Sequence, residues 1–324
     1  MTSTPDAPPA AGSGTRFPDF FIVGHPKCGT TALFEILRRH PRIHMPVKEP
    51  SYFGTEVLSH WYAKPERDPL QAYLALFEDA APEQLIGEAT PAYLRSATAP
   101  ARIAEAQPGA RIIAILREPA SFVRSLHLQF VQSNMETEKN LRKALALEAR
   151  RREGQDVPEG FRPQAFLYAD RVRYVEQLKC YHDAFPPEQV LVLIYDDFRR
   201  DNAGTVRSVL RFLELEEPDS IEQVEANPTV HVRSRRMNHA VQAVAMGAGP
   251  LATAIKLPMK ALMPRSLRLK LFRTTRQRVL FSAPPEPDED VMRELRQRFK
   301  PEVVALSEYL NRDLVRLWGY DRVE

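Results

Sequence analysis

Short, continuous apolar segments alternate along this chain with segments of helical periodicity, and this alternation limits the possible folds. The apolar segments are Phe20–Val23, Leu85–Ile86, Arg111–Leu116 and Val190–Tyr195. Consecutive apolar residues are typical of strands that are buried on both faces, as in a parallel sheet covered by helices. The sequence therefore predicts an α/β fold: an open, mostly parallel sheet flanked by helices, with ligands bound at the carboxyl ends of the strands.

Helical periodicity is clearest in three segments. Apolar residues three and four apart give one buried face to Thr31–Arg39 and to Pro119–Gln132, and the latter begins with a proline suited to a first helical turn. Met292–Trp318 has a similar periodicity, and we expect it to pack against the core. Glu153–Pro163 is rich in Gly, Pro and charge, which predicts a surface loop.

The length of 324 residues fits one domain with an elaborated surface, which we place at residues 17–324. Residues 1–16 are mostly Pro, Ala, Gly, Ser and Thr, so we expect a disordered tail and no signal peptide. No apolar run approaches the roughly 20 residues of a membrane-spanning helix. The 2 cysteines are too few for a disulfide framework. These features predict a cytoplasmic protein.

Basic residues are concentrated late in the chain. Residues 227–285 contain 11 Lys and Arg and no Asp or Glu, although the net charge of the whole chain is only +3. This asymmetry indicates an anionic partner, such as a nucleotide, a sulfated or phosphorylated acceptor, or an acidic membrane surface. We interpret residues 227–285 as a basic insert or lid. A solvated basic face is the alternative.

Within this insert, Ser266–Phe281 is predicted to be an amphipathic basic helix. One option is therefore peripheral contact with the inner face of the membrane through residues 251–281. A nucleic-acid partner is not expected, and the oligomeric state stays open.

A glycine-containing loop, Gly24-His25-Pro26-Lys27-Cys28-Gly29-Thr30-Thr31, joins the first predicted strand to a helix. Such a loop presents backbone N–H groups and the positive end of a helix to a phosphate. Its lysine stands two positions before Gly29, whereas the loop of nucleoside triphosphatases has the lysine directly after the glycine. Only Asp196 and Asp197 are candidates to hold magnesium. Both features argue against ATP with a metal and fit a sulfuryl group, which a lysine can stabilise without metal.

The segment Pro26–Thr31 resembles the 5′-phosphosulfate loop of sulfotransferases that use 3′-phosphoadenosine 5′-phosphosulfate (PAPS). The resemblance implies the P-loop-like sulfotransferase fold, with PAPS as donor cosubstrate and no metal. It also implies that Lys27 contacts the bridging oxygen and stabilises the leaving phosphate. The residues that would hold the 5′-phosphate with it are Cys28, Gly29, Thr30 and Thr31.

A second segment resembles the 3′-phosphate motif of the same family. Arg117 ends the predicted strand Arg111–Leu116, and Ser125 follows about two helical turns later. An arginine at a strand end and a hydroxyl on the next helix can converge on one phosphate. Arg233, in the late loop that the family closes over the nucleotide, is a further expected contact.

The acceptor side is predicted around Lys48-Glu49-Pro50, which resembles the Lys-Glu-Pro segment of glycosaminoglycan-type and many bacterial sulfotransferases. An acceptor hydroxyl must lose a proton as it attacks sulfur, so the site needs a general base. The resemblance assigns that role to Glu49, with Lys48 fixing geometry or neutralising charge beside it.

The segment Gly87–Tyr93 resembles the acceptor-side stretch of the family. It makes Glu88 an alternative base and Thr90 and Tyr93 candidate acceptor contacts. Ala89 stands where glycosaminoglycan enzymes usually have a lysine, which argues against a heparan-like polyanion. A carbohydrate, glycolipid or natural product bearing a hydroxyl or amine remains as the acceptor.

Two other functions stay open at this point. A metal-dependent nucleotide kinase with the same fold would bind ATP with magnesium. A membrane-docked basic binding protein would attach to anionic vesicles in a salt-sensitive way and would need no nucleotide.

Overall fold

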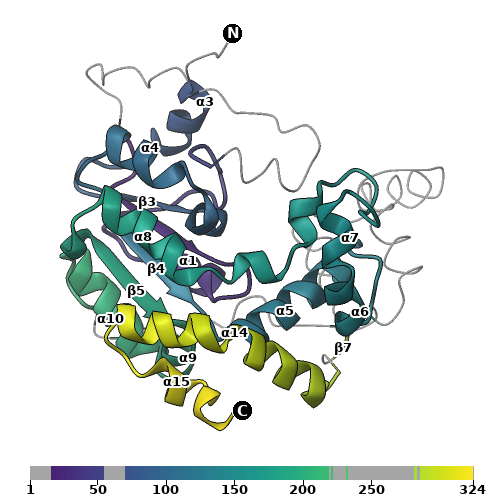
Figure 1. Cartoon of the computed structure of the whole chain (residues 1–324). Helices are drawn as coiled ribbons and strands as arrows, with labels where there is room; N and C mark the ends of the chain where they lie inside the picture. The colour runs from purple at the N-terminus through teal and green to yellow at the C-terminus, as the bar shows by residue number, and fades with distance from the viewer. Residues whose placement is uncertain are drawn as a thin grey trace, which may run out of the picture.

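A five-stranded parallel sheet forms the centre of the protein (Figure 1). The structure is a computed structural model and describes residues 16–54, 70–218, 220–221, 231–232, 281–282 and 285–323. The strands are β1 (Phe20–Gly24), β2 (Ile43–His44), β3 (Leu85–Ala89), β4 (Arg111–Leu116) and β5 (Val190–Ile194). Their order in the sheet is β2-β3-β1-β4-β5, and all four pairings are parallel. The predicted α/β fold is confirmed.

The central strands are buried on both faces, which explains why their sequences are continuously apolar. Every residue of β1 is buried, and so is every residue of β4 after Arg111. Phe20 of β1 lies opposite Gly87 of β3. A Cβ atom at residue 87 would come within 2.3 Å of the Phe20 ring, so the glycine in β3 makes room for this core phenylalanine.

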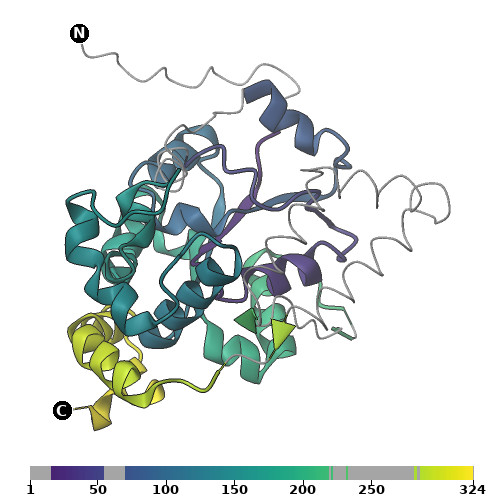
Figure 2. The same ribbon diagram turned by 90° about the vertical axis from the view of Figure 1, so that its right-hand side faces the viewer.

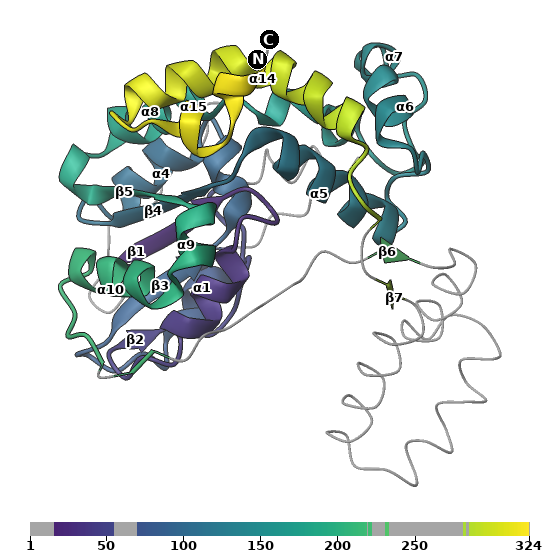
Figure 3. The same cartoon turned by 90° about the horizontal axis from the view of Figure 1, so that it is seen from below.

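Helices cover both faces of the sheet. The longer ones are α1 (Thr30–Leu37), α4 (Ala99–Ala106), α5 (Pro119–Gln132), α8 (Tyr174–Ala184), α10 (Asn202–Phe212) and α14 (Glu289–Tyr309). Shorter ones are α3 (Leu70–Leu74), α6 (Leu141–Ala146), α7 (Glu148–Arg152), α9 (Tyr195–Arg200) and α15 (Leu314–Leu317). Contacts pair α1 with α10 and α4 with α8, and Figure 3 shows α1, α9 and α10 in front of the strands. Helix α14 packs on α5 and α8, so the C-terminal helices lie beside the segment that carries α5 (Figure 2).

The strand order creates a switch point between β1 and β4. After β1, the chain adds β3 and β2 on one side of it and later adds β4 and β5 on the other side. Ligands of open α/β sheets bind at such a point, outside the carboxyl ends of the strands. Residues 24–31 follow β1 and residues 117–118 follow β4, so the fold brings the two predicted phosphate-binding segments to the same edge.

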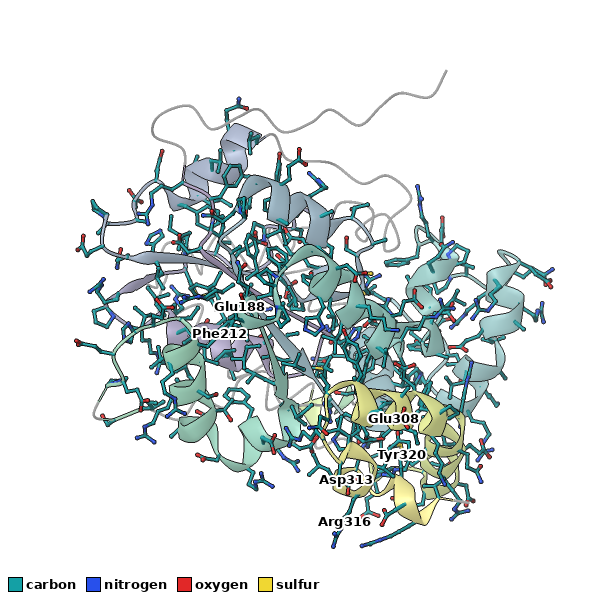
Figure 4. All side chains as sticks on the ribbon, turned by 60° about the vertical axis from the view of Figure 1, so that its left-hand side comes forward. Glu188, Phe212, Glu308, Asp313, Arg316 and Tyr320 are labelled. Carbon is teal, nitrogen blue, oxygen red and sulfur yellow. The ribbon has the colours of Figure 1, made fainter. Side chains whose placement is uncertain are left out.

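The C-terminal segment is fastened to the strand ends (Figure 4). The Asp313 carboxylate accepts a hydrogen bond from the Arg316 N–H and begins α15. The hydroxyl of the buried Tyr320 donates to Glu118, at 2.6 Å, directly after β4. Glu118 in turn accepts from the N–H groups of Ala120 and Ser121 and so caps the start of α5.

Several predicted elements differ in extent from the structure. Helix α5 has the predicted bounds, whereas β3 runs to Ala89 and therefore contains Glu88. Tyr195 begins α9 instead of ending β5, and β2 was not predicted. Met292–Trp318 contributes most of α14 and all of α15. Residues 153–162 contain no helix or strand, as predicted for a loop.

Two of the predicted segments, the tail at residues 1–16 and the basic insert, lie largely outside the described residues. The insert's two described pairs of residues form β6 (His231–Val232) and β7 (Phe281–Ser282), which pair antiparallel. Phe281 therefore lies in a strand and does not end a helix. The rest of the predicted helix, and Arg233, lie outside the described residues.

Candidate functional site

The loop after β1 has two positions that only glycine fits. A Cβ at Gly24 would lie 2.7 Å from the carbonyl oxygen of Ile115 in β4. Gly29 is the N-cap of α1 and has a left-handed φ of 88°, and a Cβ there would approach the Tyr195 ring to 3.0 Å. The N–H of Leu33 donates to the Gly29 carbonyl and starts the helix. The chain thus turns tightly into α1, with the N-terminus of the helix facing the carboxyl end of the sheet.

Lys27 and Arg117 join the two predicted phosphate-binding segments. Nη1 of Arg117 donates a hydrogen bond to the main-chain carbonyl oxygen of Lys27, at 2.9 Å. Lys27 has a left-handed φ of 69°, which is uncommon for a residue with a side chain. Burial, aided by the positive charge of Arg117, lowers the pKa of Lys27 to about 8. A strained, desolvated lysine beside an arginine is typical of a site built for an anion.

Tyr195 is a part of this site that the sequence interpretation missed. Its ring lies against Gly29, and the Arg117 guanidinium carbon stands 4.9 Å from the ring centroid. The cation–π contact and the hydrogen bond to the Lys27 carbonyl together orient the Arg117 guanidinium. Its position directly after the predicted strand was the sequence feature that could have indicated a place in the site, because ligands of such sheets bind at the carboxyl ends of the strands.

His25 and Cys28 belong to this loop, and both are fully buried. His25 donates through its Nε2–H to the amide oxygen of Gln177 at 3.0 Å, and its ring lies beside those of Phe122 and Tyr174. Burial lowers the pKa of His25 to about 3 and raises the pKa of the Cys28 thiol to about 12. At neutral pH both are uncharged, which suits a supporting role within the loop.

Thr30, Thr31 and Ser125 lie on the helices that follow β1 and β4. Thr30 and Thr31 begin α1, and Ser125 lies in α5, the helix that starts two residues after Arg117. Thr30 and Ser125 are buried, and Thr31 is half-buried. Their contacts with a nucleotide stay a prediction.

Glu49 lies on a strained loop, residues 49–53, that runs alongside the end of β3. Glu49 and Ser51 have left-handed φ values of 64° and 62°. The Glu49 side chain is 56% exposed and is paired with the ammonium group of Lys48, whose side chain is only 18% exposed. The two residues predicted to do chemistry, Lys27 and Glu49, therefore both have left-handed backbones. Such strain is concentrated at functional sites.

Glu88, Thr90 and Tyr93 lie behind this loop, and none of them is more than 2% exposed. The Glu88 carboxylate accepts hydrogen bonds from the hydroxyls of Tyr73 and Thr90, and it is also hydrogen-bonded to the side chain of Tyr93. Burial raises its pKa to about 7. These groups are bonded to one another in the structure, and their predicted contact with an acceptor stays a prediction.

Asp196 and Asp197 are engaged with the C-terminal segment. Asp196 accepts from Nε1 of Trp318 at 3.0 Å, and Asp197 is paired with Arg200 and Arg312. In the described part of the chain, no group of three or more His, Cys, Asp or Glu side chains is placed to hold a metal ion. None of the described helices is long and apolar enough to cross a membrane.

A model of the sulfotransferase family matches residues 18–219, which include the loop after β1, the Glu49 loop, Arg117 and Ser125. The chain belongs to the sulfotransferase family. The sulfotransferase of Alicyclobacillus acidocaldarius has a similar structure, with a TM-score of 0.62 and 25% identity over 94% of this chain and 99% of that one. The P-loop-like sulfotransferase fold is therefore confirmed.

Curated relatives are similar over part of their length. Human heparan sulfate glucosamine 3-O-sulfotransferase 6 is 34% identical over 36% of this sulfotransferase and 32% of its own chain. Human carbohydrate sulfotransferase 15 is 26% identical over 61% of this chain and 44% of its own. The membrane-associated sulfotransferase kil1 of Dictyostelium discoideum is 34% identical over 34% and 22%. The chain thus spans less than half the length of each of these relatives.

Proposed function

We propose that this sulfotransferase transfers a sulfuryl group from PAPS to a hydroxyl or amine of a carbohydrate, glycolipid or natural-product acceptor. The observation that carries the proposal is the hydrogen bond from Arg117 to the carbonyl oxygen of Lys27. It holds a 5′-phosphate loop and a 3′-phosphate arginine together at one switch point. A donor with phosphates at both positions would contact both of these segments.

The loop after β1 supplies the 5′ part of the donor site. The N-terminus of α1 and its Thr30 and Thr31 hydroxyls offer hydrogen-bond donors to a phosphate. Because a Cβ at residue 29 would crowd Tyr195, the glycine allows the loop to pack against this ring. Arg117, with Ser125 on the following helix, supplies the 3′ part, and a guanidinium can bind a phosphate with two parallel hydrogen bonds.

Lys27 is the residue proposed to stabilise the leaving group. As the acceptor oxygen or nitrogen bonds to sulfur, the bond from sulfur to the 5′-phosphate oxygen breaks and negative charge collects on that oxygen. A desolvated ammonium group stabilises this charge more strongly than an exposed one, because little solvent screens it. The products are the sulfated acceptor and 3′-phosphoadenosine 5′-phosphate (PAP).

Glu49 is the proposed general base that takes the acceptor's proton. Its side chain is mostly exposed, whereas Glu88 is fully buried behind three hydroxyl groups. A base must come within hydrogen-bond distance of the proton that it removes. The exposure of Glu49 therefore favours it over Glu88.

The acceptor class rests on relatives whose names specify carbohydrates, among them the 3-O-sulfotransferase of heparan sulfate glucosamine and carbohydrate sulfotransferase 15. Ala89 replaces the lysine expected of enzymes for polyanionic glycans. A weakly charged sugar or a glycosylated product is therefore a better match than a highly sulfated polymer.

The direct test supplies sulfur-labelled PAPS with an acceptor panel of heparosan, desulfated chondroitin, a neutral glycolipid and p-nitrophenol. We expect acceptor-dependent transfer of label with release of an equal amount of PAP. If PAPS is bound and no panel member, nor a whole-cell extract of small molecules and glycans, becomes labelled, the transferase proposal fails.

A further inference from the structure

The loop at residues 49–53 is held by a regular set of hydrogen bonds to the end of β3. The N–H of Glu49 donates to the Ala89 carbonyl at 2.9 Å, and that of Ser51 donates to the Thr90 hydroxyl at 3.3 Å. The N–H of Phe53 donates to the Tyr93 hydroxyl at 3.0 Å. Every second N–H of the loop thus points at this one stretch. Two of the three acceptors are side-chain hydroxyls.

A hydroxyl oxygen accepts a hydrogen bond from the loop only if its own proton points elsewhere. Here the hydroxyl protons can point to the Glu88 carboxylate, which accepts hydrogen bonds from them. The Thr90 hydroxyl donates to the Glu88 carboxylate at 2.7 Å, and the Tyr93 hydroxyl is also bonded to it. When Glu88 is ionised, above its pKa of about 7, its carboxylate accepts hydrogen bonds only, so each hydroxyl that is bonded to it turns its proton toward it. The lone pairs then face Ser51 and Phe53.

The environment of Glu88 is costly for a carboxylate. It is fully buried, and among the described residues no Lys, Arg or His is paired with it. An unpaired buried carboxylate reduces stability, and such groups are retained at sites where they serve a function. Tyr73 donates the third hydrogen bond to Glu88, and its hydroxyl forms no described hydrogen bond with the loop.

We infer that Glu88 is a positioning residue that fixes the hydroxyls of Thr90 and Tyr93 as acceptors for the loop and thereby presents Glu49. The strained backbone at Glu49 and Ser51 needs such support, because left-handed φ values are unfavourable for residues with side chains. Arg102 adds to it from α4, donating to the Phe53 carbonyl at 2.7 Å. This inference deepens the proposed function and rests on Glu49 being the base.

Amide hydrogen exchange of peptides covering residues 45–54 tests the inference without an acceptor. In Glu88→Gln the side-chain amide donates where the carboxylate accepted, so at least one hydroxyl must reorient. We expect exchange of this peptide to be roughly 10-fold faster or more, the change expected for the loss of about one hydrogen bond. Thr90→Val and Tyr93→Phe, which remove one acceptor each, should have the same direction of effect.

Tyr73→Phe is the matched control, because it removes a hydroxyl from the same carboxylate and leaves the loop's acceptors in place. It should leave exchange of the 45–54 peptide within about twofold of the wild type, since the loop keeps all three bonds. Affinity for PAP, measured by calorimetry, should be unchanged in all four variants. If Glu88→Gln does not fold, Thr90→Val alone still tests the inference, because the N–H of Ser51 loses its only described acceptor in that variant.

The kinetic readout separates positioning from general stability. With an acceptor from the panel, Glu88→Gln should lower kcat at least 10-fold and leave the KM for PAPS within twofold. Unchanged exchange of the 45–54 peptide in Glu88→Gln and Thr90→Val would overturn the inference and leave the base assignment intact. Faster exchange in Glu88→Gln together with full turnover in Glu49→Gln would overturn the base assignment instead.

Discussion

Arg117 donates a hydrogen bond to the carbonyl oxygen of Lys27, at 2.9 Å, beyond the paired ends of β4 and β1. The bond joins the residue expected to select the 3′-phosphate to the loop expected to bind the 5′-phosphosulfate. The hydroxyl of Tyr174 in α8 donates a hydrogen bond to the carbonyl oxygen of Arg117 at 3.0 Å and so helps to fix the main chain there. These two hydrogen bonds fix the position of Arg117 beside the loop, and the predictions below depend on that arrangement.

Lys27→Ala should lower kcat by at least 10²-fold while the affinity for PAP falls less than 10-fold. The reason is that charge on the leaving oxygen exists mainly in the transition state, so the lysine contributes more there than in the ground state. Single-turnover transfer and calorimetry measure the two quantities. Equal losses in both would show that Lys27 serves ground-state binding.

The rate should also depend on the protonation of Lys27. Burial lowers the pKa of Lys27 to about 8, so the ammonium form is lost as the pH rises through that value. We expect kcat/KM for PAPS, which reports the free enzyme, to fall above about pH 8. In Lys27→Arg, if active, the fall should disappear, because a guanidinium stays charged. A wild-type profile that is flat to pH 10 would contradict this role.

Glu49→Gln should reduce transfer by about 10²- to 10⁴-fold, the range typical of general-base catalysis. The affinity for PAP should stay within twofold of the wild type. Glu35→Gln, on the exposed side of α1, is a control that should keep full turnover. An unchanged kcat in Glu49→Gln would remove Glu49 from the mechanism.

A buried ion pair distant from the proposed chemistry provides a test of stability. Arg151 and Glu136 are both at most 1% exposed and share two hydrogen bonds of 2.8 and 2.9 Å. Arg151→Met leaves a buried, unpaired carboxylate and should destabilise the fold by about 3–5 kcal/mol. The exposed pair of Arg142 and Glu294 is the comparison, and Arg142→Met should destabilise the fold far less than Arg151→Met does. Urea unfolding that gave equal losses for both would refute this ranking.

The sequence predicted those parts of the fold that depend on local pattern. β4 and α5 have the expected bounds because a continuous apolar run and a proline-led helical period are strong local signals. Strand β2 has two residues, too few for any periodicity to register. The run of Val, Leu and Ile before Tyr195 predicts a strand that includes this residue, yet Tyr195 begins α9.

The candidate site was predictable where a motif names the chemistry, as for Lys27 and Arg117. The arrangement of Glu88, Thr90 and Tyr93 was not predictable, because the direction of a side chain at a strand end depends on what packs against it. Here Tyr73, distant by 15 residues in sequence, closes over Glu88 and buries it. Sequence spacing alone gives no sign of such a contact.

The most direct test of the account is calorimetric binding of PAP without metal, beside ADP and beside ATP with magnesium. We predict tight, metal-free binding of PAP and weak binding of the other two. Arg117→Ala should weaken PAP binding by about 10- to 100-fold, in line with the roughly 1.5–3 kcal/mol of a charged hydrogen bond. Arg111→Ala, at the opposite end of β4, should leave it unchanged. Preference for ATP with magnesium, or PAP binding that survives in Arg117→Ala, would contradict the donor site proposed here.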